Sequence, residues 1–144
     1  AGLTRAFLVY TNTAVPPPQS GFHGLETTPD GGTFRWMTRH AVAYVPNEVG
    51  FVRLRLRAPT LPAMRPLMIE TAVAGEIADR RGLPAGQWVT YEVPSRHPAS
   101  GPFRRIDLRV NQWWAQDVAL GSRQARRPIT LMVGAIEWIP LAGR

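Results

Sequence analysis

The chain has 144 residues, of which 44% are hydrophobic, a size and composition typical of one globular domain with its own core. It has no cysteine, which excludes disulfides and thiolate sites, and no apolar stretch of the roughly 18 residues needed to span a membrane. The net charge is +7, and all 17 basic side chains are arginine. Arginine binds carboxylate and phosphate in a bidentate way, so this balance favours anionic partners. A high-GC coding bias is the alternative explanation for the missing lysines, and the two are compatible.

The 14 prolines and 13 glycines divide the chain into many short segments, which favours strands over helices. The strands predicted in chain order are Thr4–Thr11, Thr33–Met37, Ala41–Val45, Val49–Ala58, Leu67–Ala74, Gln87–Val93, Phe103–Asn111 and Ile129–Ile139, with Glu76–Asp79 after a turn at Gly75 as a candidate ninth. Thr33–Met37 and Ala41–Val45 are expected to form a hairpin-like pair around Thr38, Arg39 and His40. Residues Gln112–Pro128 are predicted to be a long irregular stretch.

The strongest fold signal is a period of two. Apolar residues and arginines alternate in Val52–Arg57, and the same alternation returns in Ile106–Asn111. Such segments are strands with one buried and one wet face. The sequence therefore predicts an all-β, jelly-roll-like antiparallel β-sandwich. Pro16-Pro17-Pro18 divides it into an N-terminal strand and proline-rich arm, residues 1–20, and a sandwich domain, residues 21–144.

No catalytic or metal motif accompanies this pattern. His23, His40 and His97 lie in three separate segments without metal-ligand spacing, and no serine lies in a nucleophile elbow. Glu70 and Glu92 can lie on neighbouring strands, as a glycosidase pair would, but are better explained as partners of the surplus arginines. We expect no enzyme activity, no cofactor and no metal.

Arg53, Arg55 and Arg57 form a basic stripe, with Arg104, Arg105 and Arg109 as candidates to extend it. A solvated face, paired with Glu70, Glu92 and Asp107, explains the stripe best. The alternative is a site for an anionic surface. Nucleic acid is not favoured, because the aromatic residues lie elsewhere.

The five tryptophans divide into two groups. Trp88 and Trp138 lie within predicted strands and are expected in the core or at its margin. Trp113 and Trp114 are adjacent in an extended loop, so their rings point in opposite directions and one is expected to face outward. That ring either packs a long loop or contacts a ligand or partner. Trp36 is the second candidate for such a surface.

The order of several segments resembles a known family. The segments are Gly21–Glu26, Gly32–Met37, Ala41–Pro46, Gly86–Trp88 and Val133–Trp138. Together they are similar to the β-sandwich, carbohydrate-binding-like domains attached to bacterial dolichyl-phosphate-mannose-type membrane glycosyltransferases, over roughly Gly21 to Pro140. The resemblance implies an extracytoplasmic, membrane-associated location.

Two functional hypotheses follow. The first is a non-catalytic module that binds carbohydrate or glycolipid, with Trp36, Trp113 and Trp114 stacking on sugars. The hydrogen-bonding residues would be Arg35, Arg39, Asn111 and Gln112. The second is a structural accessory subunit, docked on a membrane-protein complex through the N-terminal arm and the tryptophan loop.

Overall fold

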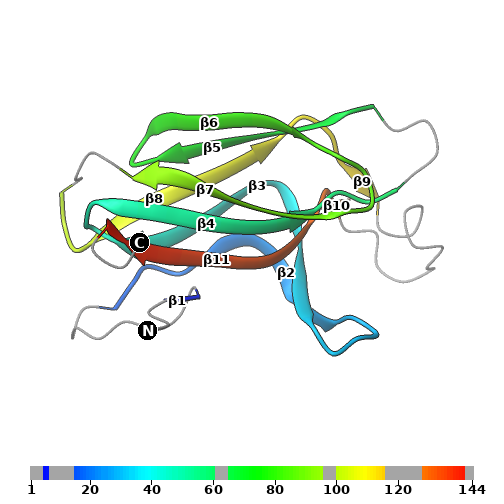
Figure 1. The fold of residues 1–144 in the computed structure, drawn as a ribbon, viewed down its shortest axis with the longest axis horizontal. Helices are drawn as coiled ribbons and strands as arrows, with labels where there is room; N and C mark the ends of the chain where they lie inside the picture. Colours follow the sequence, from blue (N-terminus) through cyan, green and yellow to red (C-terminus); the bar gives the residue numbers. More distant parts are fainter. Residues whose placement is uncertain (1–4, 7–14, 61–64, 96–99, 116–127, 142–144) are drawn as a thin grey trace.

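The part of the chain that the structure describes, residues 5–6, 15–60, 65–95, 100–115 and 128–141 of a computed structural model, is built from short strands (Figure 1). They are β1 (Arg5–Ala6), β2 (Ser20–Thr27), β3 (Thr33–Pro46), β4 (Gly50–Arg57), β5 (Leu67–Val73), β6 (Glu76–Leu83), β7 (Trp88–Ser95), β8 (Phe103–Val110), β9 (Trp114–Ala115), β10 (Pro128–Ile129) and β11 (Met132–Pro140). Every pairing between them is antiparallel, which confirms the predicted all-β class. Among these residues, no helix has the length and hydropathy needed to cross a bilayer.

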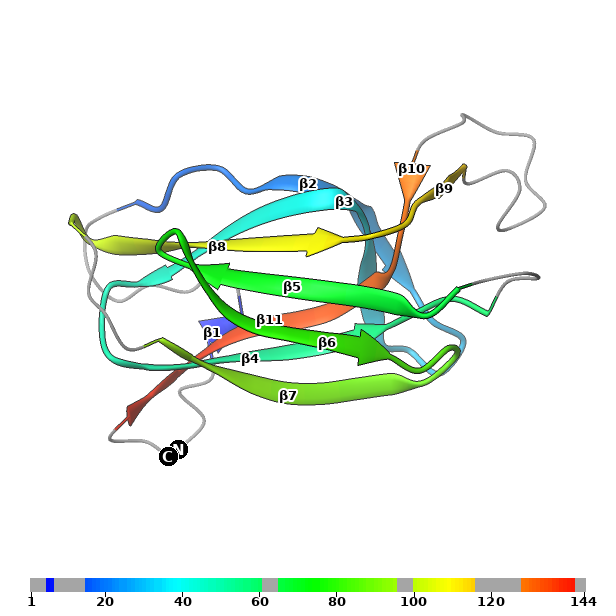
Figure 2. The same ribbon diagram turned by 90° about the horizontal axis from the view of Figure 1, so that it is seen from above.

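The strands form two layers that share β3 (Figures 1 and 2). The second half of β3 pairs with β8 and continues into β5 and β6, forming the first sheet. The first half of β3 pairs with β11 and continues into β4 and β7, forming the second sheet. The predicted β-sandwich is thus confirmed, with β3 passing from one layer to the other.

The predicted hairpin-like pair within β3 is wrong. Residues 33–46 are one continuous strand, because the backbone at its bend finds partners outside a turn. The Met37 N–H donates to the carbonyl of Leu131 at 3.0 Å. The Thr130 hydroxyl donates to the carbonyls of Met37 and Thr38 at 2.9 and 3.1 Å. These bonds satisfy the bent backbone, so the polar residues Thr38–His40 do not have to form a loop.

The core lies between the two sheets and follows the period-two pattern. Val52, Leu54 and Leu56 on β4 are fully buried, and so are Ile106 and Leu108 on β8. All five belong to one apolar cluster to which both sheets contribute. Burying each such side chain contributes about 1.5–3 kcal/mol, so these alternating faces drive the two layers together.

The N-terminal segments pair with both layers. β1 lies beside β11, with Arg5 opposite Trp138, whereas the rest of the predicted strand Thr4–Thr11 lies outside the described residues. β2 pairs along β3 with two register shifts. At the first of these Gly21 has φ +83°, and a Cβ there would collide with the His40 carbonyl oxygen. Only glycine allows the two backbones to approach so closely.

The described ends of the predicted irregular stretch Gln112–Pro128 form regular structure. β9 and β10 pair as a two-stranded ribbon, with Trp114 opposite Ile129. The ribbon projects from one end of the sandwich, as Figure 2 shows. Residues 116–127 between the two strands lie outside the described part.

Candidate functional site

The basic stripe lies on the outer face of the second sheet. Arg53 forms an ion pair with Glu92 on β7, with 2.9 Å between Nη2 and Oε2. The Arg55 guanidinium lies 4.2 Å from the centroid of the Trp88 ring, a cation–π stack. Arg57 lies opposite Trp88 in the register, and its side chain has no ion pair or hydrogen bond with another described residue. The expected pairing of this face with Glu92 is therefore present.

The expected extension of the stripe is wrong. Arg104 is fully buried, because it occupies an inward position of β8. Arg105 and Arg109 are exposed on that strand, which belongs to the first sheet and not to the sheet that carries the stripe. The carboxylate of Asp107 is on β8 with them and so is not a partner of the stripe. Sequence alternation alone does not say which strands share a sheet.

The tryptophans divide largely as expected. Trp138 is 3% exposed and Trp88 is half-buried. Of the adjacent pair, Trp113 is 52% exposed, whereas Trp114 is half-buried and packs against both apolar clusters. The expectation that Trp36 faces a ligand is wrong, because only 3% of it is exposed.

Trp36 is covered by a second, smaller apolar cluster. It packs with Phe34 and Ile129, and its ring meets the Phe34 ring edge-on, with 5.9 Å between the centroids. Trp88 and Trp114 pack against this cluster. Trp36 therefore anchors the β9–β10 ribbon to the sandwich, and the exposed aromatic surface nearby is left to Trp113.

The four predicted hydrogen-bonding residues are in different surroundings. Arg35 donates from Nη1 to the Gln19 side-chain oxygen at 3.3 Å, and Arg39 is exposed at the bend of β3. Gln112 is only 9% exposed. Its amide nitrogen donates to the carbonyls of Arg65 and Pro66, at 2.9 and 3.0 Å. Gln112 thus holds the end of the β4–β5 connection against the end of β8, contrary to the expected contact with a ligand.

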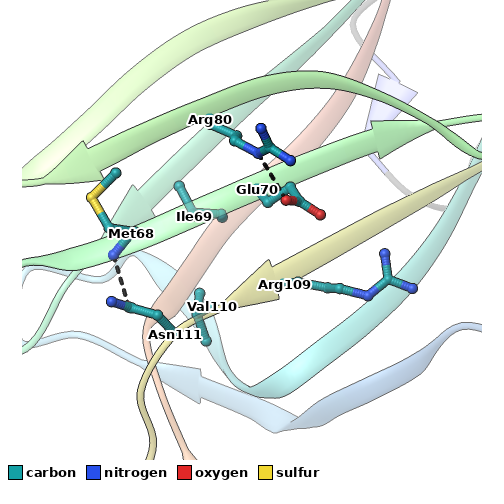
Figure 3. Close-up of a pocket in the computed structure, with 7 residues that line it drawn as sticks. All are labelled: Met68, Ile69, Glu70, Arg80, Arg109, Val110 and Asn111. Carbon is teal, nitrogen blue, oxygen red and sulfur yellow. Dashed lines mark hydrogen bonds and ion pairs between the residues drawn. The ribbon is translucent and has the colours of Figure 1, made fainter.

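Asn111 has both a structural bond and access to solvent. Its side-chain oxygen accepts from the Met68 N–H at 2.9 Å, and the residue is exposed. It also lines a cavity of about 280 Å³ on the outer face of the first sheet (Figure 3). The lining residues are Met68, Ile69, Glu70, Arg80, Arg109, Val110 and Asn111. Of the ligand-binding residues named from the sequence, Asn111 alone lines this cavity.

Alternation along the strands explains why the cavity is polar at its rim. Glu70 on β5, Arg80 on β6 and Arg109 on β8 are neighbours across the sheet and point outward. Ile69 and Val110 have their side chains buried in the core on the other side of the sheet, so only their backbone borders the cavity. The apolar side chain at the cavity is the outward-pointing Met68, which is 43% exposed. Charged groups beside an exposed apolar side chain offer hydrogen bonds and van der Waals contact to one small ligand group.

Ion pairs to Glu70 and Asp107 organise the charges on this face. Arg80 Nε lies 3.0 Å from Glu70 Oε2. Arg105 donates two hydrogen bonds to Asp107, from Nε to Oδ1 at 2.9 Å and from Nη2 to Oδ2 at 3.0 Å. His40 Nε2 lies 2.6 Å from the same Oδ2. These bonds fix the Asp107 carboxylate between β3 and β8.

Burial alone would raise the pKa of Asp107, but the hydrogen bonds from Arg105 and His40 outweigh it and hold the pKa below its usual value. The bond to Asp107 likewise raises the pKa of Arg105. A carboxyl kept ionised in this way suits an ion-pair partner and not a general acid, which needs a raised pKa. Within the described ranges, no three His, Asp or Glu side chains converge as a metal site. The arrangement is suited to binding.

Sequence reasoning missed Met68, Glu70, Arg80 and Arg109 as a site, although a signal for Arg109 existed. Arg109 lies two residues before Asn111, so a period of two places both on one face. Glu70 and Arg80 gave no such signal, since their position beside Arg109 depends on the order β6-β5-β8.

The fold and this site define an antiparallel β-sandwich with a charged cavity on one outer face. No protein-family model and no curated protein matches the sequence. Among solved structures, the chain is similar to the C-terminal CBM6 of LamC, a laminarinase from Zobellia galactanivorans, with 13% identity and a TM-score of 0.48 over 84% of this chain and 90% of that one. It is also similar to a point mutant of a family 29 carbohydrate-binding module, with 13% identity and a TM-score of 0.48 over 95% and 92%. A third similar structure is CsCBM6-3 from Clostridium stercorarium in complex with cellobiose, with 10% identity and a TM-score of 0.46 over 97% and 99%.

Proposed function

We propose that the chain is a non-catalytic module that binds carbohydrate on the outer face of the first sheet. The observation that carries the proposal is the cavity beside Asn111, with Glu70 and Arg109 at its rim and the exposed side chain of Met68 beside them. Sugars present hydroxyl edges and apolar ring faces, and hydrogen-bonding groups beside an exposed apolar side chain complement both.

Trp113 supplies the stacking surface in this proposal. It follows Asn111 by two residues, and about half of its surface, 52%, is exposed. An exposed indole on a β scaffold offers a large, rigid apolar face with little conformational entropy to lose on binding. Glycolipid as the ligand, and a location outside the cytoplasm and near a membrane, belong to the same proposal through the sequence resemblance.

The test is affinity electrophoresis of the purified chain through gels that contain neutral or acidic soluble polysaccharides. We expect at least one polysaccharide to retard the wild-type protein. Trp113→Ala should weaken that binding about 5- to 10-fold, since an aromatic contact is lost. Leu25→Ala is the matched control, because Leu25 is 64% exposed on β2, away from the cavity. Full retardation of Trp113→Ala would remove Trp113 from the site, and no retardation by any polysaccharide would refute the function.

A further inference from the structure

Arginines outnumber carboxylates in the group of charged residues at and beside the cavity. Arg80, Arg105 and Arg109 point outward on the first sheet, with the carboxylates of Glu70 and Asp107 between them. Among the described residues, each carboxylate is held by a different arginine: Arg80 binds Glu70 at 3.0 Å, and Arg105 binds Asp107 through both of its oxygens.

Arg109 is the third arginine of this group. Its Nη2 approaches Asp107 Oδ2 only to 3.6 Å, beyond hydrogen-bond distance. That oxygen already receives bonds from Arg105 and His40. The Arg109 side chain is 49% exposed and lines the cavity (Figure 3). Apart from this ion-pair contact, the Arg109 guanidinium at the cavity wall has no side-chain hydrogen bond to another described residue.

We propose that the ligand is an acidic polysaccharide whose anionic group pairs with Arg109, an inference that rests on the proposed carbohydrate-binding function. A carboxylate or a sulfate ester on a sugar accepts two parallel N–H bonds from a guanidinium, whereas a neutral hydroxyl accepts one weaker bond. The net charge of +7 adds long-range attraction for a polyanion. Glu70 and Asp107 already bind Arg80 and Arg105, so neither carboxylate forms a hydrogen bond with Arg109 that a ligand would have to break.

The experiment compares each acidic polymer with its own neutral derivative. Polygalacturonate and alginate are tested beside their carboxyl-reduced forms, and a sulfated galactan beside its desulfated form, by affinity electrophoresis at physiological salt. We expect the acidic member of at least one pair to bind about 10-fold more tightly. A preference within the carboxylate pairs or within the sulfate pair identifies which anionic group is recognised.

Two arginine variants separate specific pairing from diffuse attraction. Arg109→Gln should reduce the acidic-to-neutral affinity ratio about 10-fold, and Arg109→Lys, which keeps the charge but loses the fork, should reduce it part of the way. Arg57→Gln is the matched control, with the same loss of charge on the opposite face and no partner among the described residues to disturb. Circular dichroism of each variant checks the fold.

The outcomes are distinguishable. Equal binding of acidic and neutral members would overturn the preference for an anionic ligand and leave the carbohydrate-binding function standing. An equal loss in Arg57→Gln and Arg109→Gln would also overturn it, because the attraction would then be diffuse. If neither member of any pair binds, the carbohydrate-binding function itself fails, and the preference with it.

Discussion

Arg104 on β8 lies inside the sandwich and donates from its guanidinium to the Ser95 hydroxyl on β7. Its Nε donates to the Asn47 side-chain oxygen at 2.9 Å, while Nη2 has no hydrogen-bond partner in the described part of the chain. No carboxylate of the described residues forms an ion pair with it. Burial lowers the pKa of Arg104, with a weak opposing effect from the charge of Glu48. The buried Arg104 cation therefore has only neutral hydrogen-bond partners, and its removal from water costs solvation free energy.

Replacing this cation should not weaken the fold. We expect Arg104→Met to leave the free energy of unfolding unchanged or to raise it by up to about 2 kcal/mol, since an apolar side chain of similar length needs no solvation. Ser95→Ala should instead lower it by about 1–3 kcal/mol, because a second donor of Arg104 loses its acceptor. Urea denaturation of both variants measures these changes in the free energy of unfolding. A large loss of stability in Arg104→Met would mean that Arg104 is a necessary core residue.

The Asp107 ion pair should make stability depend on acid pH. Because the pKa of Asp107 is lower in the folded state than its ordinary 3.8, its contribution is full above that value and is lost as the pH falls below it. We expect Asp107→Asn to cost about 1–3 kcal/mol near neutral pH and less at acid pH, where the wild-type carboxyl is also protonated. Urea midpoints at both pH values measure this difference. If Asp107→Asn lowers stability equally at both pH values, the ionised Asp107 carboxylate is not the source of the stabilisation.

Tyr91 should produce the opposite dependence at alkaline pH. Burial raises the pKa of Tyr91 to about 12, although the charge of Arg81, stacked 3.6 Å from the ring centroid, opposes the shift. The folded state therefore prefers the neutral phenol, and this stabilisation is full below about pH 10 and disappears as the pH rises towards 12.

The Tyr91 hydroxyl is buried and faces that of Thr71, but among the described residues it has no hydrogen bond of good geometry, so Tyr91→Phe is a mild substitution. We expect it to change stability by less than about 1 kcal/mol at neutral pH, because only a weak polar contact is lost. The difference in tyrosinate absorbance between wild type and the variant should show one group that titrates near pH 12. A difference spectrum that titrates at the ordinary value of 10 would show that Tyr91 is accessible to water.

The stack of Arg55 on Trp88 depends on Gly134 of β11. A Cβ at Gly134 would lie 3.0 Å from both Arg55 Nη1 and Trp88 Cζ3. Gly134→Ala should therefore displace the stack, cost about 1 kcal/mol and change the tryptophan fluorescence. Gly24→Ala on β2 is the control, because a Cβ there would meet no atom within 4 Å. If both variants behave alike, the stack does not require a glycine at residue 134.

The strand faces, the burial of Arg104 and the orientation of the tryptophans could be predicted from the sequence to different degrees. The alternation in Val52–Arg57 correctly assigned the buried and wet faces of β4, since a strand turns successive side chains to opposite sides. Arg104 lies two residues before Ile106, which itself lies two before Leu108. A period of two therefore places Arg104 on the same inward face, so its burial could have been predicted. The opposite orientations of Trp113 and Trp114 also follow from adjacency in an extended chain.

The tertiary structure decided what depends on contacts between distant segments. The sequence by itself determined the all-β class, most of the strands and the inward faces of β4 and β8, because these follow from local period and turn residues. Only the fold decided that β3 joins the two layers, that Trp36 is covered, and that Glu70, Arg80 and Arg109 meet at one cavity. Strand pairing depends on contacts between segments that are far apart in the sequence. Alternation shows which face of a strand is buried but not which strand lies beside it.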